Sequence, residues 1–153
     1  MKGVDVAVAP VSSALLQLVR AHASLAVGML ADIGLAPPQE LVLLYLAEHG
    51  PSPQRDLVRY LGRDRSTVTA TVQAMERNAL IARSPSTTDG RALTVRLTRR
   101  GSGLCPRVNA IWTELEQTTF GWLTPPQRSR LVRTLADAQA RASAGRPSGG
   151  LRR

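Results

Sequence analysis

The sequence predicts a mainly α-helical fold with one small β-hairpin, an α+β class. Hydrophobic residues make up 43% of the 153 residues but aromatic residues only 3%, so the core must be built from Leu, Val and Ala, which favours helices. Residues 93–97 instead alternate apolar and polar side chains, which is typical of a half-buried strand. The length suits a single domain with a core of its own.

Two helices are predicted in the first third of the chain. Residues 11–31 carry Leu and Val at spacings of three and four, and Gly34 is a plausible stop. Residues 35–50 form the second expected helix. We place Pro37 and Pro38 in its first turn, where a missing N–H costs little.

A helix-turn-helix is predicted next. The first of its helices covers residues 52–61, with Ser52 as a cap and Pro53 in the first turn. Gly62 ends this helix, and the second helix covers residues 64–78, beginning with an aspartate that suits an N-cap. Two short helices joined by a tight turn with glycine are the signature of this motif.

Strands are expected over residues 80–83 and 92–97, joined by a polar turn. A long helix over residues 98–120 follows, and we expect interruptions near its start, at Gly101, Gly103 and Pro106. The last helix opens at Thr124-Pro-Pro-Gln127, which reads as a capping box.

The chain is divided by these elements into a central region and two flanks. Residues 35–103 hold the helix-turn-helix and the hairpin. The flanks, residues 1–34 and 104–144, carry apolar side chains that a small central region could not cover, so we expect them to be dimerisation helices. Residues 145–153 are Gly, Ser, Pro, Leu and Arg, and we expect a disordered tail.

Charge is concentrated in the middle of the chain. The formal net charge is +9, and residues 51–107 carry eleven arginines against four acidic residues. A basic block within an ordered segment suggests a surface that faces phosphates. The alternative is an ordinary solvated face that is rich in arginine because the composition of the whole chain is biased. Arg outnumbers Lys by 19 to 1, which points to such a bias.

The predicted helix over residues 64–78 has two distinct faces. Val68, Val72 and Met75 share one azimuth and should face the core. The opposite and flanking positions are Ser66, Thr67, Thr69, Ala70, Gln73 and Arg77. Short side chains allow a helix to approach base edges, Gln73 can pair with adenine, and Arg65 at the helix start suits phosphates. An ordinary amphipathic helix is the alternative.

Arg91 lies just past the hairpin turn. An arginine at such a tip can enter a narrow minor groove, where the negative potential is strongest. Asp89 can hold the guanidinium in one direction with a charge-assisted hydrogen bond. The alternative is a plain surface turn, because Asp-Gly is a favoured turn dipeptide.

Three segments together resemble the MarR family of winged helix-turn-helix transcriptional regulators over residues 11–140. They are Leu61-Gly-Arg-Asp-Arg-Ser-Thr-Val-Thr, Glu76-Arg-Asn-Ala-Leu-Ile, and Asp89-Gly-Arg-Ala-Leu-Thr-Val-Arg-Leu-Thr-Arg-Arg-Gly. The start of the last helix at Leu123-Thr-Pro-Pro-Gln127 also matches. The resemblance implies a homodimer, built from the terminal helices, that reads a pseudo-palindromic double-stranded DNA operator. It puts Ser66, Thr67, Thr69 and Gln73 in the major groove, and Arg91, braced by Asp89, in the minor groove.

The sequence departs from the family at two positions. Ala70 stands where many relatives carry Arg or Lys, and Ala36 stands where Ser or Thr is common. The first departure makes the operator harder to infer, because a polar base contact is missing.

Many members of the family release DNA when a small molecule binds, and others sense peroxide through a cysteine near the start of the chain. The only cysteine here, Cys105, comes far later, so we expect a buried structural thiol. His22 and Trp112 are candidates for an effector pocket, and packing at an interface is the alternative for both.

We therefore expect a cytoplasmic, sequence-specific repressor, with a small-molecule effector as a further expectation. The alternatives are a sequence-tolerant architectural DNA-binding protein and a protein-interaction module that does not bind DNA. No catalytic arrangement, cofactor motif or metal-ligand spacing is visible, so we expect no enzyme activity, cofactor or metal. No uninterrupted apolar run of transmembrane length is present, so we expect no membrane partner.

Overall fold

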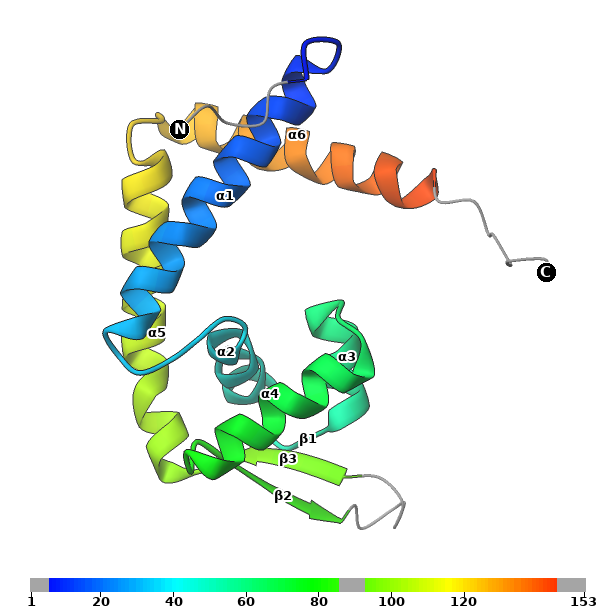
Figure 1. Ribbon diagram of the computed structural model, residues 1–153. Coiled ribbons are helices and arrows are strands. Elements are labelled where there is room, and N and C mark those ends of the chain that lie inside the picture. Colours follow the sequence, from blue (N-terminus) through cyan, green and yellow to red (C-terminus); the bar gives the residue numbers. More distant parts are fainter. Residues whose placement is uncertain (1–5, 86–92, 146–153) are drawn as a thin grey trace, which may run out of the picture. The chain divides into compact units, whose positions relative to one another are not determined.

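The computed structural model describes residues 6–85 and 93–145 and confirms the predicted order of helices and hairpin (Figure 1). Within the described residues the elements are α1 (Pro10–Ala31), α2 (Gln39–His49), β1 (Ser52–Pro53), α3 (Gln54–Leu61), α4 (Arg65–Arg77), β2 (Ile81–Pro85), β3 (Leu93–Leu97), α5 (Arg99–Phe120) and α6 (Pro125–Ala144). The chain divides into two compact units, Met1–Leu115 and Glu116–Arg153, which are described separately.

The first unit contains an antiparallel sheet with the strand order β1-β3-β2. The predicted hairpin is confirmed as β2 and β3, in which Arg83 pairs with Val95. The third strand, β1, was not predicted: Ser52 also pairs with Val95, on the other side of β3. Ser52 and Pro53 therefore do not belong to a helix, and the expectation that they open one was wrong. Their partner strand lies far along the chain, so local sequence could not reveal the pairing.

The helix-turn-helix is confirmed as α3 and α4, which Figure 1 shows on the same side of the sheet as α2. Gly62 ends α3 in the left-handed region, with φ of 59°, a conformation that glycine adopts without a Cβ penalty. Asp64 caps α4, accepting a hydrogen bond from the backbone N–H of Thr67.

The start of α2 differs from the expected position. The helix begins at Gln39, and both Pro37 and Pro38 precede it rather than occupying its first turn. Gln39 closes the entry, because its Oε1 accepts the backbone N–H of Ala36 at 3.1 Å. This bond ties the first residue of α2 to the segment before it, and no side chain caps the helix itself.

One apolar cluster holds the winged-helix elements together. Its buried members are Leu30, Leu35, Val42, Leu43, Leu46, Leu57, Val68, Val72, Met75, Leu80, Ile81, Val95, Cys105 and Val108. The predicted inward face of α4 is confirmed, since Val68, Val72 and Met75 are at most 1% exposed. Burial of this stripe fixes the opposite face of α4 towards solvent.

The long helix α5 runs without interruption from Arg99 to Phe120, so the expected break near its start was wrong. Gly101 is there for packing: a Cβ at this position would lie 2.0 Å from the backbone oxygen of Leu80. Thr98 stabilises the same approach of α5 to Leu80. Its backbone N–H donates to the Leu80 oxygen at 3.1 Å, and its Oγ1 donates to the Ala79 oxygen at 2.6 Å. Glycine permits this close approach of helix and strand start.

Helix α1 is apolar but largely uncovered within the first unit. Its exposed large apolar side chains are Val11, Leu15, Leu16, Leu18, Val19, Leu25 and Val27. By length and composition α1 could cross a membrane, with a mean hydropathy of 1.4 and 6% of the tested window buried. This finding qualifies the expectation of no membrane-spanning segment, which rested on uninterrupted apolar runs. A helix that packs against a second protein chain has the same properties.

In the second unit, the predicted capping box at the start of α6 is confirmed. Gln127 Oε1 accepts the backbone N–H of Thr124 at 2.8 Å. None of the α6 side chains is buried, and Val132 and Leu135 are exposed. Most of the expected disordered tail, residues 146–153, lies outside the described residues.

Candidate nucleic-acid interface

The outward face of α4 carries six of the eight residues predicted to contact DNA. Five of them are exposed, namely Arg65, Ser66, Thr67, Gln73 and Arg77, while Thr69 is half-buried. Because Val68, Val72 and Met75 are buried on the other side, no large apolar side chain interrupts this face. The face is short and polar, as a helix that must approach base edges requires.

Asp64 organises the first turn of α4. Its carboxylate accepts three hydrogen bonds: from the Ser66 hydroxyl, from the Thr67 backbone N–H at 2.9 Å and from Thr67 Oγ1 at 2.6 Å. These bonds hold the pKa of Asp64 far below its usual range, with the Ser66 hydroxyl as the largest cause. The carboxylate therefore favours its ionised form, in which it accepts hydrogen bonds from both hydroxyls.

Thr69 is held by two further contacts. Its Oγ1 donates to the backbone oxygen of Arg65 at 2.8 Å and accepts from Gln54 Nε2 at 2.9 Å. Gln54 is the first residue of α3, so this contact ties the two helices of the helix-turn-helix together. The hydroxyl groups of α4 are therefore ordered before any ligand arrives.

Gln73 and the arginines of α4 are the free donors of this face. Among the residues that the structure describes, no hydrogen bond or ion pair engages the side chains of Arg65, Gln73 or Arg77. Guanidinium and amide groups in this position can contact phosphates or base edges.

Glu76, on the last turn of α4, contacts Arg83 of β2. Arg83 Nε donates to Glu76 Oε2 at 2.8 Å, and Arg83 Nη2 reaches the same oxygen. The Arg83 backbone N–H donates to Glu76 Oε1 at 3.3 Å. The Arg83 contacts lower the pKa of Glu76, and they connect the hairpin to α4.

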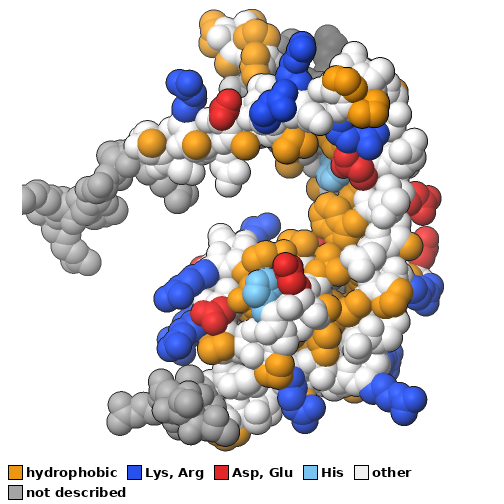
Figure 2. All heavy atoms as spheres, turned by 180° about the vertical axis from the view of Figure 1, so that it is seen from behind, with side chains coloured by type: hydrophobic (Ala, Val, Ile, Leu, Met, Phe, Trp, Pro, Cys, Tyr) orange, Lys and Arg blue, Asp and Glu red, His pale blue; other side chains and the backbone are white. Residues whose placement is uncertain are grey.

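Further basic side chains surround the helix-turn-helix. Figure 2 shows Lys and Arg side chains, in blue, at the margin of the region that holds α2, α3, α4 and the sheet. On α3, the side chains of Arg55 and Arg59 are 67% and 80% exposed, and both lie near Asp56, at 4.0 and 3.7 Å. Contacts of this length on an exposed surface are weak, so the arginines remain available to phosphates.

The hairpin tip cannot be compared with its prediction. Asp89 and Arg91 lie outside the described residues. Of the strands that carry the tip, β2 ends at Pro85 and β3 begins at Leu93.

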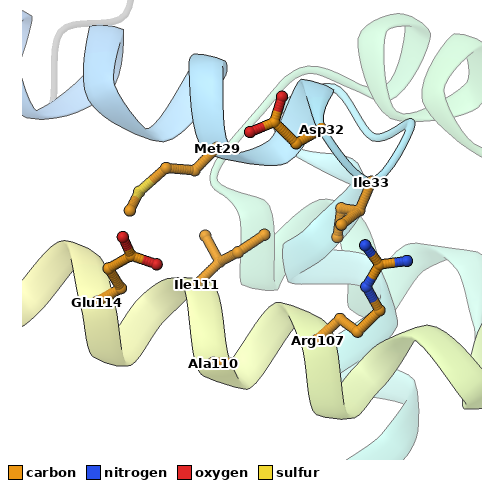
Figure 3. Close-up of a pocket in the computed structure, with 7 residues that line it drawn as sticks. All are labelled: Met29, Asp32, Ile33, Arg107, Ala110, Ile111 and Glu114. Carbon is orange, nitrogen blue, oxygen red and sulfur yellow. The ribbon is translucent and has the colours of Figure 1, made fainter.

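A pocket of about 280 Å³ lies between the end of α1 and α5 (Figure 3). Its lining residues are Met29, Asp32, Ile33, Arg107, Ala110, Ile111 and Glu114. Figure 3 shows Ile111 pointing into the space between the two segments, with Arg107 on the Ile33 side and Glu114 on the Met29 side. The two effector candidates do not line it: His22 is half-buried on α1, and Trp112 is 36% exposed on α5.

Cys105 is buried on α5, as expected. Its Sγ lies 3.5 Å from the Gly101 oxygen and 3.8 Å from the Leu43 oxygen, and burial raises the pKa of the thiol. Within the described part of the chain, no group of three or more His, Cys, Asp or Glu residues could hold a metal ion.

Four residues of this region were missed as site residues. Asp64 was predicted only as a cap, although its spacing of two and three residues from Ser66 and Thr67 signals the contacts. Gln54 and the Glu76–Arg83 pair join separate elements, and no local pattern announces them.

Comparisons with known proteins agree with this geometry. A family model described as MarR family matches residues 33–92. The chain is 35% identical over 107 residues to the HTH-type transcriptional repressor IacR of Pseudomonas putida, a match that covers 70% of this chain and 64% of IacR. The chain thus spans less than two thirds of that relative.

Solved structures also match. A probable transcriptional regulator from Pseudomonas aeruginosa is 29% identical with a TM-score of 0.76, covering 84% of this chain and 96% of that one. Bordetella bronchiseptica BpsR, whose DNA binding is regulated by 6-hydroxynicotinic acid, is 26% identical with a TM-score of 0.80, covering 90% of this chain and 98% of BpsR.

Proposed function

We propose that the chain is a member of the MarR family of winged-helix regulators and that it is a homodimeric transcriptional repressor that binds a pseudo-palindromic DNA operator. The family match over residues 33–92 and the 35% identity to IacR support this proposal. The protein acts in the cytoplasm. The sequence similarity to IacR, itself a transcriptional repressor, supports repression rather than activation.

The observation that carries the proposal is the ordered polar face of α4. Ser66 and Thr67 are held by Asp64, and Thr69 is held by Gln54. In this proposal α4 enters the major groove, as the second helix of a helix-turn-helix does. Gln73 contacts a base, and Arg65 and Arg77 contact phosphates or base edges. Arg91 enters the adjacent minor groove, with Asp89 as its brace.

The test begins with selection of bound sequences from a random DNA pool, followed by gel shifts at fixed salt. Arg91→Ala should lower affinity about tenfold or more, because a groove contact of arginine is lost. Arg141→Ala is the matched control, since it removes one exposed charge from α6. Equal affinity of the Arg91 and Arg141 variants would refute the assigned role of Arg91.

Selection that enriches no sequence would favour a sequence-tolerant architectural protein, and absence of any DNA binding at low salt would favour a protein-interaction module.

The homodimer is supported by the exposed apolar side chains of α1, which a second copy would cover. Val19, 54% exposed, offers a test. Val19→Asp should shift the sedimentation coefficient from that of a dimer to that of a monomer. Ser102→Asp adds the same charge at an exposed position of α5 and should leave the dimer intact. A dimer in both variants would count against an α1 interface.

A small-molecule effector is the remaining part of the proposal. The pocket between α1 and α5 has an apolar centre at Ile111 and is lined by one guanidinium, at Arg107, and two carboxylates, at Asp32 and Glu114. An aromatic carboxylic acid would bind there with its ring on Ile111 and its carboxylate on Arg107. His22 and Trp112 stay candidates for contacts with the effector. Titration with aromatic carboxylic acids, 6-hydroxynicotinic acid included, should weaken DNA binding by the wild type and not by Arg107→Ala. Loss of the response in Arg141→Ala as well would contradict the assignment.

A further inference from the structure

We propose that Asp64 sets the hydrogen-bonding polarity of the α4 face, so that Ser66 and Thr67 meet DNA as acceptors and select bases that carry an amino group. This inference rests on the proposed function. It assigns Asp64 as a positioning residue that determines specificity through Ser66 and Thr67.

The argument starts from the hydroxyl group. Each Ser or Thr hydroxyl has one hydrogen to donate and two lone pairs that accept. The Ser66 hydroxyl donates to Asp64 Oδ1, and Thr67 Oγ1 donates to Asp64 Oδ2 at 2.6 Å. The single hydrogen of each group is therefore committed to Asp64, and only lone pairs remain for a ligand.

Asp64 cannot exchange roles with these hydroxyls. An ionised carboxylate only accepts, so both bonds have a fixed direction. The three hydrogen bonds that Asp64 accepts stabilise its ionised form, and its pKa lies well below neutral pH. The direction is thus the same at every pH at which the protein would meet DNA.

Thr69 follows the same rule through other partners. Its hydroxyl hydrogen goes to the Arg65 oxygen, and one lone pair is taken by Gln54 Nε2. The hydroxyl hydrogens of Ser66, Thr67 and Thr69 are therefore all donated to acceptors within the protein. None of them is left for a ligand at the outward face of α4. Gln73 is the exception, because its amide can both donate and accept.

Base edges in the major groove differ in this respect. Adenine N6 and cytosine N4 carry amino groups that donate, whereas guanine N7 and O6 and thymine O4 accept. A lone pair on Ser66 or Thr67 is complementary to an amino group and repels a carbonyl. Every base pair carries one such amino group, on its adenine or its cytosine, so the prediction concerns one strand. On the strand that Ser66 and Thr67 contact, the base should be adenine or cytosine.

The experiment compares the sequences selected by the wild type with those selected by Asp64→Asn. Asparagine keeps the helix cap, since it is as good an N-cap as aspartate. Its NH₂ group donates instead of accepting, which frees a hydroxyl hydrogen of Thr67 or Ser66 to point outward. Asp56→Asn is the matched control, because it removes the same charge from the neighbouring helix α3. Ser66→Ala and Thr67→Ala identify the operator positions that the two hydroxyls contact, and thermal unfolding checks that every variant is folded.

At those positions the wild type and Asp56→Asn should select adenine or cytosine, and Asp64→Asn should accept guanine or thymine. Replacing a contacted adenine by purine, which lacks the amino group, should weaken the wild type about fivefold and Asp64→Asn less. Guanine or thymine at the mapped positions for the wild type, or the same selection by Asp64→Asn, would overturn the inference. Failure of the wild type to select any sequence would instead overturn the proposed function.

Discussion

Glu76 at the end of α4 holds Arg83 of β2 through both its guanidinium and its backbone N–H. The side chain of Arg83 is 21% exposed, so the contact is partly shielded from water. The pair joins the helix that we place in the major groove to the strand that leads to Arg91. Hydrogen bonds between ionised partners are stronger and more directional than neutral ones, so this contact adds a directional constraint to the apolar packing between α4 and the hairpin.

Glu76→Ala should therefore weaken DNA binding about tenfold while changing the free energy of unfolding by only about 1 kcal/mol. The reason is that the hairpin loses its charged contact with α4 while the apolar core that also joins them stays intact. Gel shifts and thermal unfolding measure the two effects. Glu48→Ala, at an exposed position of α2, is the control. In a double-mutant cycle with Arg83→Ala the two losses should not add, and full additivity would mean that the pair does not act as a unit.

Gly101→Ala should destabilise the protein by about 3 kcal/mol, because a Cβ 2.0 Å from the Leu80 oxygen forces backbone atoms apart. Gly103→Ala is the matched control two residues later. Its Cβ would meet no atom within 4 Å, so it should stabilise α5 by about 0.5–1 kcal/mol. Chemical denaturation of both variants gives the comparison. A small effect of Gly101→Ala would indicate that α5 can shift away from Leu80 at little cost.

Glu40→Gln should raise stability at neutral pH. Glu40 is 4% exposed, and its Oε2 has no hydrogen-bond partner among the described residues. Desolvation raises the pKa of Glu40 above its usual 4.5. Its contribution to stability is therefore complete below pH 4.5, and it is lost as the pH rises through the folded-state pKa.

Melting temperatures measured between about pH 4 and 8, a range that spans the expected titration of Glu40, would reveal this contribution. The difference between wild type and Glu40→Gln should grow with pH. Glu48→Gln, an exposed change on the same helix, should give a difference that does not depend on pH. A constant difference for Glu40→Gln too would mean that water or a counter-charge reaches the carboxylate.

Cys105 should react slowly with a thiol reagent in the native protein and rapidly after unfolding. The side chain is 8% exposed and burial raises its pKa, so thiolate is scarce at neutral pH. A colorimetric thiol assay with and without denaturant gives the two rates. Rapid reaction of the folded protein would contradict this assignment and would point to redox sensing.

Much of the fold follows from local periodicity. The stripe of Val68, Val72 and Met75 fixes one face of α4 inward, and the opposite face is then known without coordinates. The cap at Asp64 and the stop at Gly62 depend on one or two residues each, and both were predicted. The second wing strand was predicted from alternation, which also depends only on neighbours.

The remaining features depend on contacts between distant segments. Ser52 lies in strand β1, not in a helix, because its backbone pairs with Val95. Gly101 was interpreted as a break because local propensity disfavours glycine in helices, whereas the close approach to Leu80 requires it.

The sequence by itself determined which residues lie on the outward face of α4, since helical periodicity alone separates them from Val68, Val72 and Met75. Only the tertiary structure decided how those residues are held: Gln54 braces Thr69 and Glu76 holds Arg83 across separate elements. The physical reason is range. Helical periodicity and capping act over a few residues, whereas a hydrogen bond between two elements exists only after the core has brought those elements together.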